Sequence, residues 1–382
     1  MRIVHIADSH LGLAAFSRVD GDGMNLRERL VYENFLAGID HIIAQRPDVL
    51  VHAGDLFDRV RPKTRAYTTV LAACDRLLEA DIPLVAIAGN HSMPKTRYTP
   101  SPFEVLAYHA GTLHLAYRYR YEPVEIGDVM FHLIPNMLSA ADYRSAYDAI
   151  VRAPDHANVL VTHGLASMLS DHRLKTVAEH ELDATILSAD FDYIALGHFH
   201  DQRRIADNAW YSGSQEYVSY GEIRDTKGGL LVDTDSRAVT HLPLPHTPMM
   251  DLGRISCAGR SAEEIVGAVM AAVEGVPSDL SNPMCQLTLD GIERETLHAL
   301  GRRELGEARS RVLDLRFRVI AADTPVPTIG HDLKTVDYVE EFAEFLRKHP
   351  PAEQEYAFVL NTGQEVLRTI MARHTEDYNA AP

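Results

Sequence analysis

Five short segments of this chain each end a hydrophobic run with a residue that can bind a metal ion. In sequence order they are Asp8-Ser9-His10, Gly54-Asp55-Leu56-Phe57-Asp58, Gly89-Asn90-His91, Thr162-His163-Gly164 and Gly197-His198-Phe199-His200. A single histidine near a strand is usually a packed, hydrogen-bonded residue, and we expect this of His5, His52 and His132. Five segments that each follow a predicted strand instead indicate a site for two metal ions.

Two divalent ions about 4 Å apart can hold both the attacking and the leaving oxygen of a phosphoryl transfer. Because two cations at that distance repel each other, they need a shared carboxylate, for which Asp55 is the candidate. The other ligands divide between the ions: we expect Asp8, His10 and His200 on the first, and Asn90, His163 and His198 on the second. Alternate residues of an extended segment project the same way, which suits the Asp-x-His and His-x-His spacings. Mixed nitrogen and oxygen ligands favour Mn, Fe or Zn over Mg or Ca.

One histidine of these segments is a candidate catalyst rather than a ligand. His91 directly follows the ligand Asn90, which places a proton donor beside the second ion, near the leaving oxygen or a phosphate oxygen. Asp58, three residues after the bridging carboxylate, is the candidate that orients the His91 ring.

The charge of the chain bears on its partners. Proteins that hold DNA unaided usually present a basic face, and a net charge of −17 argues against one here. Basic residues nevertheless follow the second and third segments. We expect phosphate contacts from Arg59, Arg61, Lys63, Lys95 and Arg97.

The elements that must position these residues alternate along the first part of the chain. Strands are predicted at 3–7, 49–53, 84–88, 129–134, 159–162 and 193–196. Apolar residues at helical spacing predict helices before the second and third strands. Pro47 and Pro83 lie just ahead of these strands, where the helices must already have ended. We predict an α/β fold with a layered β-sandwich core flanked by helices, and with the ligands in loops past the carboxyl ends of the strands.

Three parts are predicted along the chain. Residues 1–246 form the domain with the metal ligands, and the proline-rich segment 242–248 ends it. Residues 247–325 form a small α/β capping domain, and residues 326–382 form a tail of two amphipathic helices. The three scattered cysteines, the absence of an apolar leader and the absence of a run of about 20 apolar residues predict a cytoplasmic protein with no membrane span.

The five segments resemble the calcineurin-like metallophosphoesterase signature D-x-H, G-D-x-x-D, G-N-H and G-H-x-H. Within that superfamily the chain is most similar to the SbcD-type nucleases, the bacterial counterparts of the Mre-type nucleases of double-strand-break repair. This narrower match rests on Asp8-Ser9-His10-Leu11-Gly12, Gly54-Asp55-Leu56-Phe57-Asp58 and Thr162-His163-Gly164. The resemblance covers nearly the whole chain, but after about residue 246 it is only architectural.

The resemblance implies a DNA nuclease that processes DNA ends with two Mn²⁺ ions per chain, for which Fe, Zn and Mg are alternatives. It implies 3′-to-5′ exonuclease and single-strand endonuclease activity, in a homodimer assembled with an SbcC/Rad-type ABC ATPase. The tail helices would dock on the coiled coil of that partner, which would also supply DNA-binding surface. The candidate docking residues are Phe342, Leu346, Val359, Leu360, Val366, Leu367 and Ile370. Packing of the tail on its own capping domain is the alternative.

Two positions depart from the family pattern. Ser92 follows the G-N-H motif where an acid is usual, so the orientation of His91 depends more on Asp58. Some of these nucleases carry His at the position of Asp58, and Asp is equally common there in protein phosphatases. A protein phosphatase, cyclic-nucleotide phosphodiesterase or nucleotidase is therefore one alternative, although the capping domain and tail favour the nuclease. A catalytically silent DNA-end scaffold is another.

Overall fold

The computed structural model describes residues 1–96, 98–166, 181–182, 190–300, 305–322, 342–343, 345–347 and 356–366. The chain folds into two compact units, Met1–Ala322 and Asp323–Pro382. Three predicted functional residues, Arg97, Leu367 and Ile370, lie outside the described residues. Within the described part of the chain, no helix is long and apolar enough to cross a membrane.

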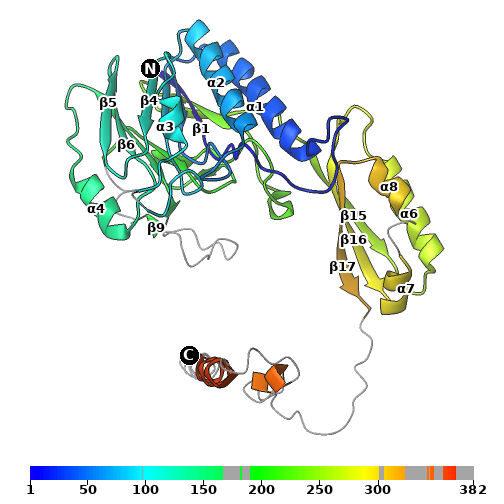
Figure 1. Cartoon of the computed structure of the whole chain (residues 1–382). Helices are drawn as coiled ribbons and strands as arrows, with labels where there is room; N and C mark the ends of the chain where they lie inside the picture. The colour runs from blue at the N-terminus through cyan, green and yellow to red at the C-terminus, as the bar shows by residue number, and fades with distance from the viewer. Residues whose placement is uncertain are drawn as a thin grey trace. The chain divides into compact units, whose positions relative to one another are not determined.

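Two six-stranded sheets form the centre of the first unit (Figure 1). The first contains, in spatial order, β14 (Ala238–Leu242), β13 (Gly229–Asp233), β1 (Arg2–Ile6), β2 (Val49–His52), β3 (Leu84–Ile87) and β4 (Leu113–Ala116). The second contains β11 (Arg203–Arg204), β12 (Ala209–Tyr211), β10 (Tyr193–Gly197), β7 (Ala157–His163), β6 (Val129–Ile134) and β5 (Glu122–Ile126). A two-stranded sheet of β8 (Leu165–Ala166) and β9 (Glu181–Leu182) completes this part.

One apolar core joins the two sheets. It contains Val51 and Val85 from the first sheet and Phe131 and Val161 from the second, all of them fully buried. Strands β1 to β4 run parallel, as do β6, β7, β10 and β12. Since parallel strands end at the same edge, the residues that follow them can meet there. The predicted layered β-sandwich is confirmed.

Helices cover the outer faces of the sandwich. Helices α1 (Leu26–Ala44) and α2 (Thr64–Glu79) lie side by side over the first sheet (Figure 1). The Asn25 side chain caps α1 by accepting a hydrogen bond from the Glu28 amide. The shorter helical elements are α3 (Phe103–Leu106), α4 (Ala140–Asp148) and the 3₁₀ turn η2 (Tyr220–Glu222). The two helices predicted from apolar spacing are therefore present.

A third sheet follows in the chain. Its parallel strands, in order, are β15 (Met249–Ser256), β16 (Met284–Ile292) and β17 (Asp314–Ala321). Helices α6 (Ala262–Glu274), α7 (Arg294–Ala299) and α8 (Gly306–Ser310) pack on it around a separate apolar core (Figure 1). This sheet and its helices lie within residues 247–325, the range predicted for the capping domain. They belong to the first compact unit, and a smaller cluster that includes Leu26, Tyr220 and Leu313 joins them to the sandwich.

The second unit contains short helical segments at 342–343, 345–347 and 356–366. Phe342 packs closely on Gly363, where an added Cβ would lie 2.3 Å from the ring. Leu346 is buried, whereas Phe358 and Val366 are exposed. The predicted docking residues Val359 and Leu360 are half-buried.

Candidate metal centre

All seven predicted ligands lie at or just past the carboxyl ends of parallel strands. Asp8 and His10 follow β1, Asp55 follows β2 and Asn90 follows β3. On the second sheet, His163 ends β7, and His198 and His200 follow β10. The site therefore draws on both sheets, and its residues come together only when the sandwich forms.

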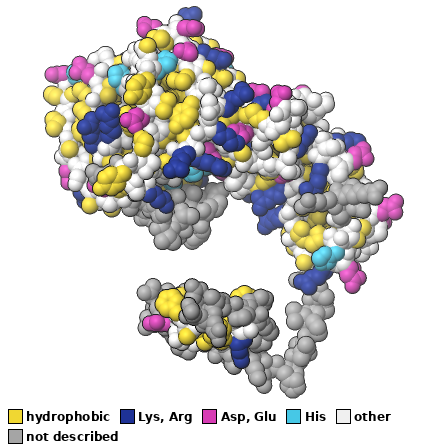
Figure 2. All heavy atoms as spheres, in the orientation of Figure 1, with side chains coloured by type: hydrophobic (Ala, Val, Ile, Leu, Met, Phe, Trp, Pro, Cys, Tyr) yellow, Lys and Arg dark blue, Asp and Glu magenta, His cyan; other side chains and the backbone are white. Residues whose placement is uncertain are grey.

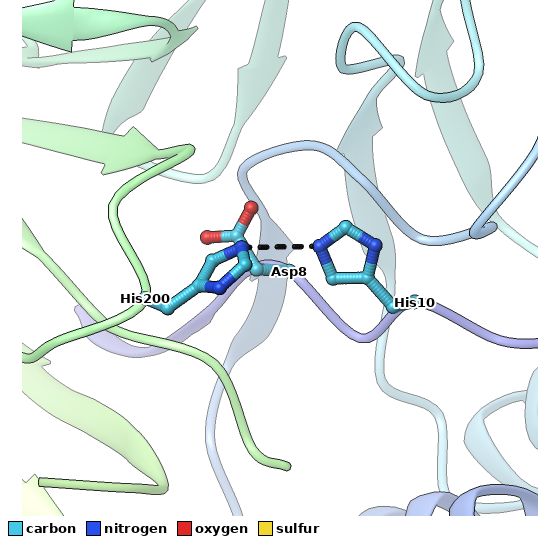
Figure 3. A group of neighbouring side chains, drawn as sticks. All are labelled: Asp8, His10 and His200. Carbon is cyan, nitrogen blue, oxygen red and sulfur yellow. Dashed lines mark hydrogen bonds between the residues drawn. The ribbon is translucent and has the colours of Figure 1, made fainter. Parts of the chain in front are cut away.

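Asp8, His10 and His200 form one half of the site, which we name the first half-site. One ligand atom from each of the three lies within 4.8 Å of the others. The Nε2 atoms of His10 and His200 face each other at 3.2 Å, with the Asp8 carboxylate beside them (Figure 3). Both Asp8 oxygens accept the backbone N–H of His198 at 3.0 Å, which ties this half-site to the other.

The second half-site consists of Asp55, Asn90, His163 and His198. The amide oxygen Oδ1 of Asn90 lies 2.8 Å from His163 Nε2 and 3.2 Å from His198 Nδ1. His163 Nε2 also lies 3.2 Å from Asp55 Oδ2. Two imidazoles, an amide and a carboxylate thus present ligand atoms to one small volume. The sequence predicts the same two groups as the ligands of two separate ions.

Asp55, the predicted bridging carboxylate, lies between the two half-sites. It joins His163 and His198 in one cluster and His10 and His91 in another, so its carboxylate borders both half-sites. It is buried, and its Oδ1 accepts the backbone N–H of His91 at 2.9 Å.

The hydrogen bonds behind the site leave the facing nitrogens free for metal binding. His163 Nδ1 donates to the Ala53 carbonyl at 2.9 Å, and His200 Nδ1 lies 3.1 Å from Glu222 Oε1. A proton held on Nδ1 leaves the lone pair on Nε2, the nitrogen that faces the site. The ligands therefore fit two divalent ions.

The backbone at the site is strained. Asp8, His10, Asp55 and His198 have φ values of 54°, 45°, 52° and 103°. Such conformations cost about 1–3 kcal/mol each for residues with a Cβ and persist where the surrounding structure enforces them. Four of them among seven ligands indicate that the fold holds these side chains in place for binding.

Charge coupling inside the site keeps Asp55 ionised and His163 protonated. Burial raises the pKa of the Asp55 carboxyl, but the imidazoles of His163 and His10 outweigh this effect and hold the pKa well below its usual range. Burial lowers the pKa of His163, but the Asp55 carboxylate outweighs it and raises the pKa to about 9. Without metal, Asp55 and His163 are thus an ion pair, and a metal ion must displace the His163 proton.

The predicted pairing of His91 with Asp58 needs a correction. His91 Nδ1 lies 2.8 Å from the backbone carbonyl of Asp58, not from its carboxylate. The carboxylate lies instead 3.4 Å from His10 Nδ1 and 3.4 Å from Arg59 Nε. The loop after β2 turns its backbone toward the ring, so the carbonyl, not the carboxylate, accepts the hydrogen bond from Nδ1–H. The Asp58 carboxylate therefore lies beside the ligand His10 without a hydrogen bond to it, while the Asp58 backbone orients His91.

Two further residues support the site and were not predicted. Glu222 contacts His200, as described above, and Lys227 binds the same carboxylate at 2.7 Å. Burial raises the pKa of Glu222, but His200 and Lys227 outweigh it and hold the pKa well below its usual range. Neither residue belongs to a metal segment. Their only sequence signal is that a Glu and a Lys lie five residues apart downstream of the His pair.

A cavity of about 400 Å³ adjoins the second half-site. Asn90, His163 and His198 line it together with Lys95, one of the predicted phosphate contacts. This places a cation where a phosphate beside the second ion would lie.

The remaining predicted phosphate contacts differ in their surroundings. Arg59 is exposed and lies beside Asp58, and Arg61 is exposed farther along the same loop. The Lys63 ammonium lies 2.6 Å from the buried Glu28 carboxylate, which gives it a structural partner. On the face shown in Figure 2, Lys and Arg side chains gather in several groups despite the negative net charge.

The histidines expected to be packing residues are buried. His5 Nδ1 lies 2.9 Å from the Tyr193 hydroxyl, and His52 Nε2 lies 2.9 Å from Ser9 Oγ. His132 lies between Tyr121 and Asn158. All three cysteines are buried free thiols, as predicted.

Comparison with protein families agrees with this geometry. The model of the calcineurin-like phosphoesterase family matches residues 1–202, which include all seven predicted ligands. The chain belongs to the calcineurin-like phosphoesterase family. A dinuclear centre for divalent metal ions is the implied cofactor of this family, and the Asp and His clusters described above fit it.

Within this family the chain is similar to DNA repair proteins. It is 30% identical over 237 residues to the DNA double-strand break repair protein Mre11 of Methanococcus maripaludis, an alignment that covers 59% of this chain and 60% of the relative. It is 28% identical over 277 residues to the SbcD component of the nuclease SbcCD of Staphylococcus saprophyticus, covering 66% and 70%. The chain spans about 60% of the length of the first archaeal relatives.

Proposed function

We propose that this chain is a metal-dependent DNA nuclease that trims DNA ends in double-strand-break repair. The observation that carries the proposal is the pair of half-sites that share Asp55, since this arrangement suits a phosphodiester between two ions. The printed names of the relatives, which include double-strand break repair proteins and a component of a nuclease, support DNA as the substrate.

The residues of the site have different proposed roles in DNA cleavage. Two bound ions would polarise the phosphorus–oxygen bonds and activate the attacking water. Asp55 and the histidine and asparagine ligands would hold the two ions. His91 Nδ1–H donates to the Asp58 carbonyl, so Nε2 faces the site. When the ring is protonated at both nitrogens, Nε2–H can give its proton to the leaving oxygen, and the neutral ring keeps the proton on Nδ1. Lys95 offers a positive charge to a phosphate in the adjoining cavity.

Manganese is the metal that we propose, with two ions per chain. The ligand set of imidazoles, carboxylates and one amide suits Mn, Fe or Zn, while Mg prefers oxygen ligands alone. We place the protein in the cytoplasm, where its three thiols stay reduced.

The proposed partners are a second copy of this chain and an SbcC/Rad-type ABC ATPase that binds the tail helices. The name of one relative, which describes it as part of a nuclease complex, supports the larger assembly. The exposed Phe358 and Val366 of the tail supply apolar surface for it. Removal of residues 323–382 should abolish binding to the ATPase in a pull-down and leave manganese binding intact.

The test of the nuclease is degradation of linear double-stranded DNA by the full chain in Mn²⁺, with EDTA and Asp55→Ala as controls. We expect loss of DNA that requires the metal and the Asp55 carboxylate. Hydrolysis of a small chromogenic phosphoester without any cleavage of DNA, alone or with a cognate ATPase, would show another phosphoesterase activity and refute the proposal. Bound DNA without cleavage of either substrate would indicate the silent scaffold.

A further inference from the structure

Glu222 uses both carboxylate oxygens as acceptors. Oε1 lies 3.1 Å from His200 Nδ1 and 3.3 Å from Ser219 Oγ. Oε2 accepts from the Val218 backbone N–H at 2.9 Å and from the Lys227 ammonium at 2.7 Å. Glu222 is only 8% exposed, so water has little access to replace these partners.

This arrangement determines which nitrogen of His200 carries a proton. An ionised carboxylate can only accept hydrogen bonds, so the His200 nitrogen that faces it must be Nδ1–H. The lone pair of the ring then lies on Nε2, which faces His10 within the first half-site. Glu222 thus fixes both the tautomer and the direction of the ring.

Lys227 holds the same histidine from a second side. Its side chain is fully buried, and its ammonium lies 3.1 Å from the His200 carbonyl and 2.9 Å from Ser214 Oγ. Through Glu222 and Lys227, the ring and the backbone of His200 are fastened to one segment, residues 214–227.

That segment is in turn anchored to the three-stranded sheet. Tyr220, in the same 3₁₀ turn as Glu222, donates its hydroxyl to Asp314 Oδ2 at 2.8 Å and lies 3.2 Å from the Cys285 carbonyl. The Arg316 guanidinium lies 5.2 Å from the centre of the Tyr220 ring. Tyr220 is 8% exposed and packs in the cluster that joins the sheet to the sandwich.

We propose that Glu222 is a positioning residue for the first half-site, and that the β15-β16-β17 sheet keeps the Glu222 carboxylate in place through Tyr220. This role rests on the proposed metal centre. The sheet, which supplies no metal ligand itself, therefore influences how tightly the first ion binds. A partner that shifts the sheet against Tyr220 would change the affinity of that ion without touching a ligand.

Glu222→Gln tests the positioning role. Glutamine has one acceptor oxygen, and the Lys227 ammonium attracts it more strongly than an imidazole does. Its amide NH₂ then faces His200 Nδ1, which favours the tautomer that carries the proton on Nε2 and blocks metal binding there. We expect one of two manganese sites to weaken about 10–100-fold, as losses of such supporting contacts commonly do.

The matched control is Glu28→Gln. Glu28 is also a buried carboxylate beside a lysine, accepting from Lys63 at 2.6 Å and from the Tyr32 hydroxyl at 2.9 Å, but it contacts no ligand. Manganese titration of the full chain by calorimetry gives the number and affinity of the sites. Electron paramagnetic resonance separates a spin-coupled manganese pair from a single ion.

Tyr220→Phe tests the connection to the sheet, because it removes only the hydroxyl. We expect the same site to weaken by a smaller factor than in Glu222→Gln. Tyr121→Phe, which removes a hydroxyl that bonds His132 at 2.8 Å, should leave both sites unchanged.

The outcomes separate the possible failures. Wild-type chain that binds no manganese would refute the metal centre and this role with it. Two sites in the wild type and equal affinities in Glu222→Gln and Glu28→Gln would refute the positioning role and leave the metal centre intact. Weaker manganese binding in Glu222→Gln, with unchanged binding in Tyr220→Phe, would refute the role of the β15-β16-β17 sheet.

Discussion

Gly54→Ala should remove the second half-site without changing any ligand. Gly54 has φ of 104°, and a Cβ there would lie 2.2 Å from His163 Nδ1 and 2.7 Å from its Cγ. The His163 ring has little room to move away, because Gly197 encloses it from another side. A Cβ added at Gly197 would lie 2.9 Å from His163 Nδ1. His163 must move, and its bond to the Ala53 carbonyl is lost.

Two costs add in this variant. A residue with a Cβ at such a φ costs about 1–3 kcal/mol, and overpacking beside a fully buried ring costs about 1–3 kcal/mol more. The free energy of unfolding of the metal-free chain should therefore fall by about 2–6 kcal/mol. Urea denaturation measures this change, and manganese calorimetry should show one site in place of two.

Gly21→Ala is the matched control, because an added Cβ at Gly21 meets no atom within 4 Å. It should bind two ions and unfold at an unchanged urea concentration. If Gly54→Ala also bound two ions with unchanged stability, the close approach of Gly54 to His163 would not be what holds the second half-site.

The same contacts give expectations for pH dependence, catalysis and core stability. Manganese affinity should rise about tenfold per pH unit up to about pH 9, because the His163 imidazolium beside Asp55 must lose its proton to bind metal. Calorimetry in buffers of different ionisation enthalpy measures the released proton. An affinity independent of pH between about 6 and 8 would exclude this proton release. His91→Ala should keep both ions and lose about 10²–10⁴-fold in the rate of DNA cleavage, whereas full activity would exclude His91 as the proton donor. Arg27→Met should lower the free energy of unfolding by about 3–5 kcal/mol, since it leaves the buried Glu216 carboxylate without the guanidinium 2.8 Å away. The double variant Arg27→Met/Glu216→Leu should lower the free energy of unfolding by less. Equal losses in the two variants would show that the unpaired Glu216 charge is not the cause.

The sequence identifies the candidate ligands because each one lies at, or a few residues past, the end of a strand that is itself recognisable. Strands β1, β2 and β3 are short runs of buried apolar residues, and the two long helices between them have regular apolar spacing. Once the strands are parallel neighbours, their carboxyl ends must meet, and no further information is needed to bring Asp8, Asp55 and Asn90 together.

Short and peripheral strands are harder to predict. Strands β11 and β12 have two and three residues, too few for any periodicity to be visible. Strand β13 pairs antiparallel with β1 although it lies far later in the chain, with Asp233 opposite Arg2. Such pairings depend on long-range packing that local patterns do not encode.

Supporting contacts escape prediction for a similar reason. Glu222 reaches His200 from a 3₁₀ turn that packs against the third sheet, far along the chain from the His pair. The Asp58 contact with His91 is made by the backbone, which the residue type does not reveal. Lys63 follows a metal segment, as a phosphate-binding residue would, yet the buried Glu28 on α1 binds it.

Anomalous scattering of manganese in crystals of the full chain would show the number and the positions of the bound ions. We expect two peaks about 4 Å apart, one beside Asp8, His10 and His200 and one beside Asn90, His163 and His198, with Asp55 between them. A single peak, or two peaks that do not share Asp55, would contradict the dinuclear centre.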